Sequence, residues 1–216
     1  MNDNLKLWGR ATSVNVQKVA WLIAELELDC DRIDAGGAFG GLDDKRYLAL
    51  NPNKKVPTLI DGTFVLWESN AICRYLVNKY GSYSPLKDAN FTKQAQADMW
   101  MEWFQNNVYS NFIALFYQAV RLPPSQRSLE KRDTALQAVN SALALFDDAL
   151  ETKKFVCGNV LSVGDIPTGS CLHRYFTMEI KRPAFSNLER YYEDLKIRKT
   201  YQDHVMVDYS SLRGSD

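Results

Sequence analysis

The chain has 216 residues, which is enough for one large domain or two small domains with a buried core. Its 26 basic residues balance its 26 acidic residues, and no basic stripe indicates a nucleic-acid or anionic-membrane partner. The first residues lack the apolar core of a signal peptide, and no apolar run approaches membrane-spanning length. These patterns predict a cytoplasmic protein that binds neither nucleic acid nor a membrane.

The cysteines and histidines do not form the patterns of a metal site. Four cysteines are widely scattered, without a C-x-x-C pair: Cys30, Cys73, Cys157 and Cys171. Isolated cysteines of this kind are typical of free thiols in a reducing compartment. The two histidines, His173 and His204, also stand alone. No metal is therefore expected.

The first 80 residues alternate between strand-like and helix-like segments. A short apolar run at 5–8 is typical of a strand, and an apolar stripe predicts an amphipathic helix over 14–28. The Asp61-Gly62 pair between two apolar runs is a strong hairpin signal. The expected order is strand, helix, strand, helix, hairpin and helix, over 5–8, 14–28, 30–34, 42–50, 56–67 and 68–79.

After this region the periodicity is helical only. Turn-forming residues and a proline indicate a linker over 83–90, and long helices are expected over 91–120 and 128–152. Ser162 and Asp165 have the spacing of a capping box, which predicts a helix start there. The prediction is therefore an α/β domain over 1–82, a linker over 83–90 and an all-α domain over 91–216.

Four motifs occur in an order and at separations that resemble the glutathione S-transferase family, in particular its bacterial theta-like and nu-like members. They read TSVNVQKV, NPNKKVPTL, WESNAI and LSVGDI. The resemblance covers nearly the whole chain. It implies a thioredoxin-like, glutathione-binding first domain, an all-helical second domain, and a homodimer as in relatives generally.

The resemblance also implies how glutathione is held. Pro57 would follow a cis peptide bond, and the Val56 backbone would pair with the cysteinyl backbone of glutathione by strand addition. Ser69 would bind the γ-glutamyl carboxylate at a helix N-terminus and Glu68 would receive the ammonium, with Lys55 near the glycyl carboxylate. From the residues alone, a trans proline at a strand start, helix capping by Ser69 or Glu68 and a solvated Lys55 are the alternatives.

The chemistry would take place at ATSVNV, where a helix N-terminus faces the expected position of the glutathione sulfur. Hydrogen-bond donors and a helix N-terminus lower the pKa of a thiol, and the thiolate is the reactive form. The resemblance assigns Ser13 and Asn15 as the donors to this sulfur, and Thr12 is an alternative to Ser13. Helix capping is a common use of both Ser13 and Asn15.

The second substrate would be a small hydrophobic electrophile. Tyr109, Phe112 and Phe116 share one face of the expected helix over 91–120, and they are the candidate pocket residues. An aromatic stripe at this spacing more often belongs to a hydrophobic core.

Three functions therefore compete. The leading prediction is a glutathione transferase that conjugates glutathione to the electrophile. The first alternative is a glutathione-dependent disulfide reductase or peroxidase, which nu-like members favour and Asn15 allows. The second is a non-catalytic ligand-binding protein of the same fold.

Overall fold

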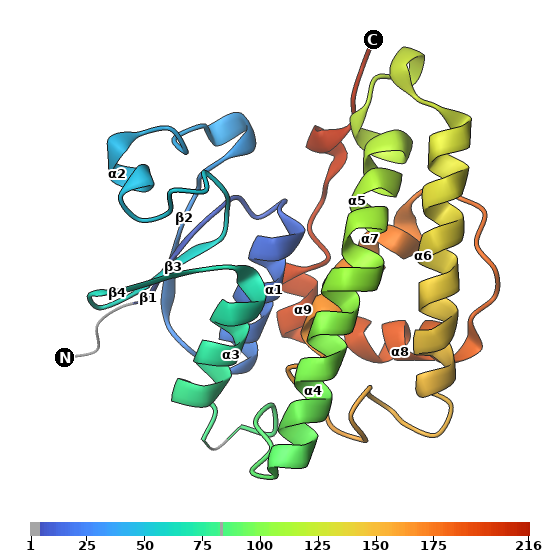
Figure 1. Ribbon diagram of the computed structural model, residues 1–216. Helices are drawn as coiled ribbons and strands as arrows, with labels where there is room; N and C mark the ends of the chain where they lie inside the picture. Colours follow the sequence, from blue (N-terminus) through green and yellow to red (C-terminus); the bar gives the residue numbers. More distant parts are fainter. Residues whose placement is uncertain (1–4, 83) are drawn as a thin grey trace. The chain divides into compact units, whose positions relative to one another are not determined.

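The computed structural model describes residues 5–82 and 84–216, and it divides into two compact units (Figure 1). The first unit consists of Met1–Lys87 with Lys199–Val207, and the second of Asp88–Arg198 with Asp208–Asp216. The division at Lys87 falls inside the linker that the sequence predicts over 83–90, of which residue 83 lies outside the described part. The segment 199–207 differs from the prediction, because it belongs to the first unit instead of the helical one.

A four-stranded sheet forms the centre of the first unit. The strands follow the order β2-β1-β3-β4, where β1 and β2 are parallel and the other neighbours are antiparallel. Leu5 and Leu7 alternate with exposed or half-buried residues on β1 and are almost fully buried. The strands are β1 (Leu5–Trp8), β2 (Cys30–Ile33), β3 (Thr58–Asp61) and β4 (Phe64–Trp67). The expected hairpin about Gly62 is confirmed by the β3–β4 pairing.

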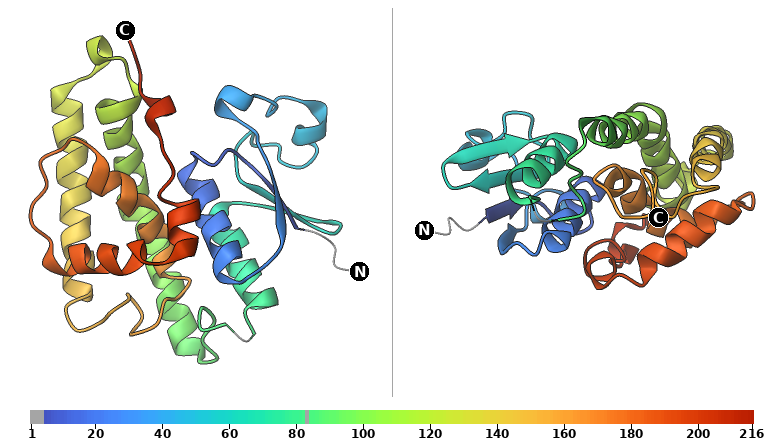
Figure 2. Two further views of the ribbon diagram at one scale, coloured as in Figure 1. Left: turned by 180° about the vertical axis from the view of Figure 1, so that it is seen from behind. Right: turned by 90° about the horizontal axis from the view of Figure 1, so that it is seen from below.

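Two longer helices of this unit, α1 (Val14–Glu25) and α3 (Ser69–Tyr80), pack against each other beside the sheet (Figures 1 and 2). Helix α1 ends at Glu25 and does not reach the predicted 28, because Glu27 adopts a φ of 54°, which lies outside the right-handed helical region. Helix α2 spans only Lys45–Leu48 of the predicted 42–50. It precedes the bend that leads into β3.

A late segment of the chain completes the core of the first unit. Helix α9 (Lys199–His204) packs on α1, and Trp21 and Tyr201 meet edge to face with their ring centroids 5.0 Å apart. Both rings are fully buried. The Trp21 indole N–H donates to Glu25 at 2.9 Å, and the Thr200 hydroxyl donates to the same carboxylate. Helix α9 belongs to the first unit because Trp21 and Tyr201 bury each other's rings, and burial of such large apolar surfaces is favourable.

The second unit is built from helices in its described residues. A continuous helical stretch covers the predicted 91–120, and α6 (Leu129–Ala149) packs along α5 in all views (Figures 1 and 2). The stretch contains two π-helical segments and consists of α4 (Phe91–Trp103), η2 (Phe104–Tyr109), α5 (Ser110–Phe116) and η3 (Tyr117–Arg121). Helices α7 (Asp165–Thr177) and α8 (Ser186–Lys196) follow α6. None of the helices described in either unit has the length and apolar character needed to span a membrane.

Helix α7 begins at the predicted Ser162 and Asp165 pair, with a changed hydrogen-bond pattern. The fully buried Asp165 carboxylate accepts from the Ser162 backbone N–H at 2.8 Å and from the Ser162 hydroxyl at 2.7 Å. In a capping box the hydroxyl would instead accept from the backbone of the third residue. Asp165 also accepts from the Val156 N–H at 2.9 Å and the Tyr191 hydroxyl at 3.2 Å. The carboxylate therefore fixes the loop before α7 as well as the helix start.

Candidate functional site

The start of α1 places short polar side chains at a helix N-terminus. Ser13 occupies the N-cap position with an extended backbone, φ −91° and ψ 122°, and its carbonyl accepts from the Gln17 N–H at 2.8 Å. Its side chain makes no capping hydrogen bond. Thr12, Ser13 and Asn15 are all half-buried. The Ser13 hydroxyl is thus not used to cap the helix, which leaves it able to donate to a ligand.

The bend before β3 contains the predicted cis peptide bond. The Val56–Pro57 bond is cis, as the resemblance implies. Pro57 is buried, Val56 is half-buried and Lys55 is exposed. The proline lacks an N–H and lies directly before the first residue of β3, so it costs the sheet no hydrogen bond.

The start of α3 has an unusual backbone at its first position. Glu68 adopts a φ of 72° and a ψ of 110°, a combination that non-glycine residues rarely take. Such residues cost about 1–3 kcal/mol and cluster at ligand-binding sites. Ser69 is 5% exposed and is the first residue of the helix, whereas Glu68 is exposed. Neither side chain caps α3 in the way the sequence alternative proposed, since Glu68 at the N-cap makes no side-chain cap bond.

One hydrogen bond connects the two helix starts. The Ser69 hydroxyl donates to Asn15 Oδ1 at 3.3 Å, across 54 positions of sequence. Both residues lie in the first turn of a helix, where backbone N–H groups have no partner inside the helix. The N-termini of α1 and α3 therefore meet, and together they form a site suited to an anion.

A buried polar network lies next to the cis bend, and the sequence analysis did not identify it. Tyr47 at the end of α2, Asn51 and Thr58 are each at most 2% exposed. The Tyr47 hydroxyl and the Asn51 amide both donate to the carbonyl oxygen of Lys55, and each of these two side chains also hydrogen-bonds to the Thr58 hydroxyl. The sequence signal that could have found this network is the polar pair Asn51 and Thr58 on either side of the motif NKKVP, together with a tyrosine one helical turn before Asn51.

The cysteines of the first unit do not provide a reactive thiolate. Burial raises the pKa of Cys30 to about 11, and burial raises that of Cys73 to about 12. Both thiols therefore stay protonated near neutral pH. Among residues 5–82 and 84–216, no group of three or more His, Cys, Asp or Glu side chains is placed to hold a metal ion. A reactive sulfur at the start of α1 would have to come from a ligand.

The aromatic stripe of the second unit lies mostly in its core. Phe112 and Phe116 are 1% and 2% exposed, and only Tyr109 is half-buried. The Phe116 ring lies 4.8 Å from the Arg174 guanidinium carbon and 5.6 Å from the centre of the Tyr209 ring. Packing inside the unit thus accounts for Phe112 and Phe116, and Tyr109 is the most accessible of the three predicted pocket residues.

The fold and the site together define a class of protein. A sheet in the order β2-β1-β3-β4, a cis proline before β3 and a polar start to α1 and α3, combined with an all-helical unit, are the features of a glutathione transferase with a thioredoxin-like domain. Family models agree with this assignment. Residues 3–78 match the glutathione S-transferase N-terminal domain and residues 108–197 match the C-terminal domain. The chain belongs to the glutathione S-transferase family.

Individual relatives support the same conclusion. Glutathione S-transferase GstB of Escherichia coli is 35% identical over 95% of this chain and 100% of its own length. A theta-class glutathione S-transferase from Xanthomonas axonopodis pv. citri, solved with glutathione bound, is 39% identical with a TM-score of 0.91, over 96% of this chain and 99% of that chain. Glutathione transferase BmGSTD1 of Bombyx mori is 25% identical with a TM-score of 0.86, over 97% and 96%.

Proposed function

We propose that this transferase binds glutathione in its first unit, ionises the thiol and conjugates it to a hydrophobic electrophile. The observation that carries the proposal is the hydrogen bond between Ser69 and Asn15. It joins the helix start suited to a carboxylate to the helix start suited to a thiolate. The glutathione-bound structure of the Xanthomonas relative supports glutathione as the ligand.

Each residue at the site has a proposed role. The half-buried Val56, in the bend before β3, pairs its backbone with the cysteinyl backbone of glutathione by strand addition. The backbone N–H groups at the start of α3, that of Ser69 included, hold the γ-glutamyl carboxylate, and Glu68 receives the γ-glutamyl ammonium. The Ser69 hydroxyl joins this contact when its proton turns from Asn15 to the carboxylate. The exposed Lys55 faces the glycyl carboxylate.

Thiol activation is assigned to the start of α1. Ser13 donates its hydroxyl to the sulfur, and the side-chain amide of Asn15, whose Oδ1 accepts from Ser69, is the proposed second donor. Thr12 is the alternative hydroxyl. A hydrogen bond to a charged group contributes about 1.5–3 kcal/mol, and one pKa unit needs about 1.4 kcal/mol. One or two donors with the helix terminus therefore suffice to lower the thiol pKa by about one to two units.

The electrophile and the assembly complete the proposal. Of the predicted pocket residues, Tyr109 is the proposed contact for a small hydrophobic electrophile, because Phe112 and Phe116 are buried in the core of the second unit. The protein is proposed to act as a homodimer without a metal. Analytical ultracentrifugation would test the assembly, since a dimer has twice the chain mass of 24.7 kDa.

Disulfide reduction is the second candidate, because Asn15 lies at the sulfur position in either case. Parallel assays with a chloronitrobenzene electrophile and with a small dialkyl disulfide separate the two activities. Conjugation that is saturable in glutathione and faster than disulfide reduction supports the proposal. Faster reduction supports the alternative, and glutathione binding without either activity indicates a ligand-binding protein.

A further inference from the structure

The bend that carries Val56 is held by a closed ring of hydrogen bonds. The Tyr47 hydroxyl donates to the Lys55 carbonyl, and Asn51 Nδ2 donates to the same carbonyl at 2.9 Å. Asn51 Nδ2 also donates to Thr58 Oγ1 at 3.0 Å, and Thr58 Oγ1 lies 2.9 Å from Tyr47 Oη. A phenol has a single proton, and Tyr47 gives it to Lys55, so the Thr58 hydroxyl must donate to Tyr47. Every member of the ring then has a partner.

Asn51 is fully used by this arrangement. Its two amide hydrogens go to the Lys55 carbonyl and to Thr58, and its Oδ1 accepts from the Asn53 backbone N–H at 3.0 Å and the Asn53 side chain at 3.1 Å. An amide offers two donated and two accepted hydrogen bonds without strain, so no capacity is left for a ligand. The role of Asn51 is therefore to hold the chain around it.

The ring of hydrogen bonds holds the bend at residues on both sides of Val56 and Pro57. Lys55 is the residue before Val56, and Thr58 is the residue after Pro57. Burial raises the pKa of Tyr47, against the lowering effect of its contacts with Thr58 and Asn51, so its hydroxyl stays a donor at neutral pH. The ring thus fixes the Lys55 carbonyl oxygen before Val56 and the Thr58 hydroxyl oxygen after Pro57. A shift of the Lys55 carbonyl would rotate the backbone N–H and C=O that Val56 presents.

We propose that Tyr47 and Asn51 are positioning residues, which fix the Lys55 carbonyl so that Val56 presents its backbone to the cysteinyl part of glutathione. This inference rests on the proposed function, because it concerns the same glutathione site. Neither side chain needs to touch the ligand. Their effect should therefore fall on glutathione binding and leave the ionisation of the thiol, which depends on α1, unchanged.

The test is steady-state kinetics of Tyr47→Phe with glutathione and a chloronitrobenzene. Loss of the hydroxyl removes one of the two hydrogen bonds to the Lys55 carbonyl and should raise KM for glutathione about three- to tenfold. The kcat at saturating glutathione, KM for the electrophile and the pH profile of kcat should not change. Asn51→Ala removes the other hydrogen bond to Lys55 and serves the same test if Tyr47→Phe does not fold.

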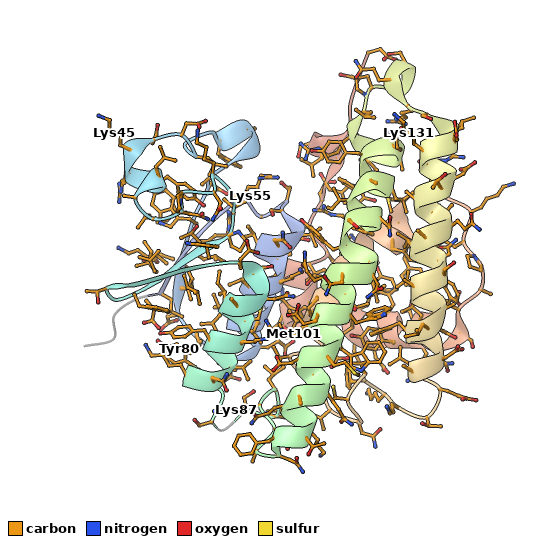
Figure 3. The ribbon with its side chains drawn as sticks, viewed as in Figure 1. Lys45, Lys55, Tyr80, Lys87, Met101 and Lys131 are labelled. Carbon is orange, nitrogen blue, oxygen red and sulfur yellow. The ribbon has the colours of Figure 1, made fainter. Side chains whose placement is uncertain are left out.

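Two controls separate positioning from a general loss of stability. Tyr80→Phe removes a buried-carboxylate hydrogen bond of 2.7 Å at the far end of α3, well away from Lys55 in Figure 3, and should leave KM for glutathione unchanged. Thr58→Val breaks the ring but keeps both hydrogen bonds to Lys55, so it should raise KM less than Tyr47→Phe does. Equal KM values for Tyr47→Phe and wild type, or for Tyr47→Phe and Thr58→Val, would overturn the inference.

Calorimetry of the wild-type protein with glutathione distinguishes this inference from the proposed function. If wild type binds no glutathione, both the proposed function and the positioning role of Tyr47 and Asn51 are wrong. If wild type binds glutathione and Tyr47→Phe binds it equally well, only the positioning role fails.

Discussion

The start of α1 and the bend before β3 are both parts of the proposed glutathione site, but they use their polar groups in opposite ways. Ser13 sits at the N-cap of α1 without a capping hydrogen bond from its side chain. At the bend, Asn51 makes all the hydrogen bonds that an amide can make. Asn51, which we propose fixes the backbone, has its hydrogen-bonding groups saturated within the protein, whereas Ser13, which we propose acts on the ligand, keeps its hydroxyl out of the helix cap.

This difference separates stability from activity. A saturated buried group should stabilise the fold strongly, because its removal leaves partners unsatisfied in the interior. A group that is not engaged within the protein should matter little to folding and much to catalysis. Substitutions at both kinds of residue test this separation of stability from activity, and the largest expected change in free energy comes first.

Asn51→Asp should give the largest loss of stability. The new side chain has the same shape but loses both donated hydrogen bonds, and it turns an oxygen toward the Lys55 carbonyl. We expect the free energy of unfolding to fall by roughly 3 kcal/mol, measured by urea denaturation. Asn106→Asp, at an exposed position of η2 in the second unit, is the control and should change stability by less than about 0.5 kcal/mol. An Asn51→Asp variant as stable as wild type would show that the ring does not hold the bend.

Ser13→Ala should give the opposite result. We expect kcat/KM to fall about 30-fold, or about 2 kcal/mol, while urea denaturation shows a change within about 0.5 kcal/mol. The stability stays because the hydroxyl caps no backbone N–H. Thr12→Val is the matched control for the neighbouring hydroxyl. Undiminished turnover in Ser13→Ala, with a loss in Thr12→Val, would transfer the donor role to Thr12.

Asp61 should stabilise the first unit without affecting the site. Its Oδ2 accepts from the Tyr75 hydroxyl, the Lys79 ammonium and the Tyr80 hydroxyl, each at 2.7 Å. Burial raises the pKa of Asp61, but the hydrogen bonds from Lys79, Tyr80 and Tyr75 outweigh it, so the folded pKa is lower than usual. The stabilisation is thus present above the ordinary carboxyl pKa and is lost as pH falls through the lowered folded value.

Asp61→Asn should therefore reduce stability by roughly 1.5 kcal/mol at neutral pH and by less in acid, with kcat/KM unchanged. Denaturation of both proteins between about pH 3 and 7 measures the difference. Tyr75→Phe is a control that removes one of the three hydrogen bonds and keeps the charge. A difference between the two proteins that stayed constant across this pH range would contradict the ionised role of Asp61.

The smallest effect is expected for the coupling between the two helix starts. Ser69→Ala and Asn15→Ala should each weaken glutathione binding, and a double-mutant cycle should give a coupling of about 0.5–1 kcal/mol from the hydrogen bond of 3.3 Å. Calorimetric titration with glutathione provides the four binding constants. Additive effects would mean that the carboxylate and thiolate sides of the site act independently.

Much of the first unit could be predicted because local signals mark it. The Asp61-Gly62 turn, the apolar stripe of α1 and the motif around Pro57 each specify an element within a few residues. The cis bond itself required the resemblance, since sequence alone favours trans. The role of Ser13 stays a prediction that rests on the resemblance, because its residue type suits a cap as well as a catalyst.

What the sequence did not predict depends on contacts between distant residues. Tyr201 belongs to the first unit because its ring meets Trp21, and the two are 180 positions apart in a chain whose helical periodicity places α9 with the second domain. The ring around Lys55 depends on the orientation of the Tyr47 and Asn51 side chains after α2 has formed. Phe112 and Phe116 have a pattern that more often indicates a core than a pocket, and their burial supports the core.

The most direct test of thiol activation is an ultraviolet difference titration of glutathione bound to the wild-type protein and to Ser13→Ala. Thiolate absorbance followed from about pH 5 to 9 gives the pKa of the bound thiol. We expect the wild type to lower this pKa by about one to two units below the free thiol, and Ser13→Ala to lose about one unit or more of that shift. A bound thiol that ionises at its ordinary pKa in the wild-type protein would contradict the account.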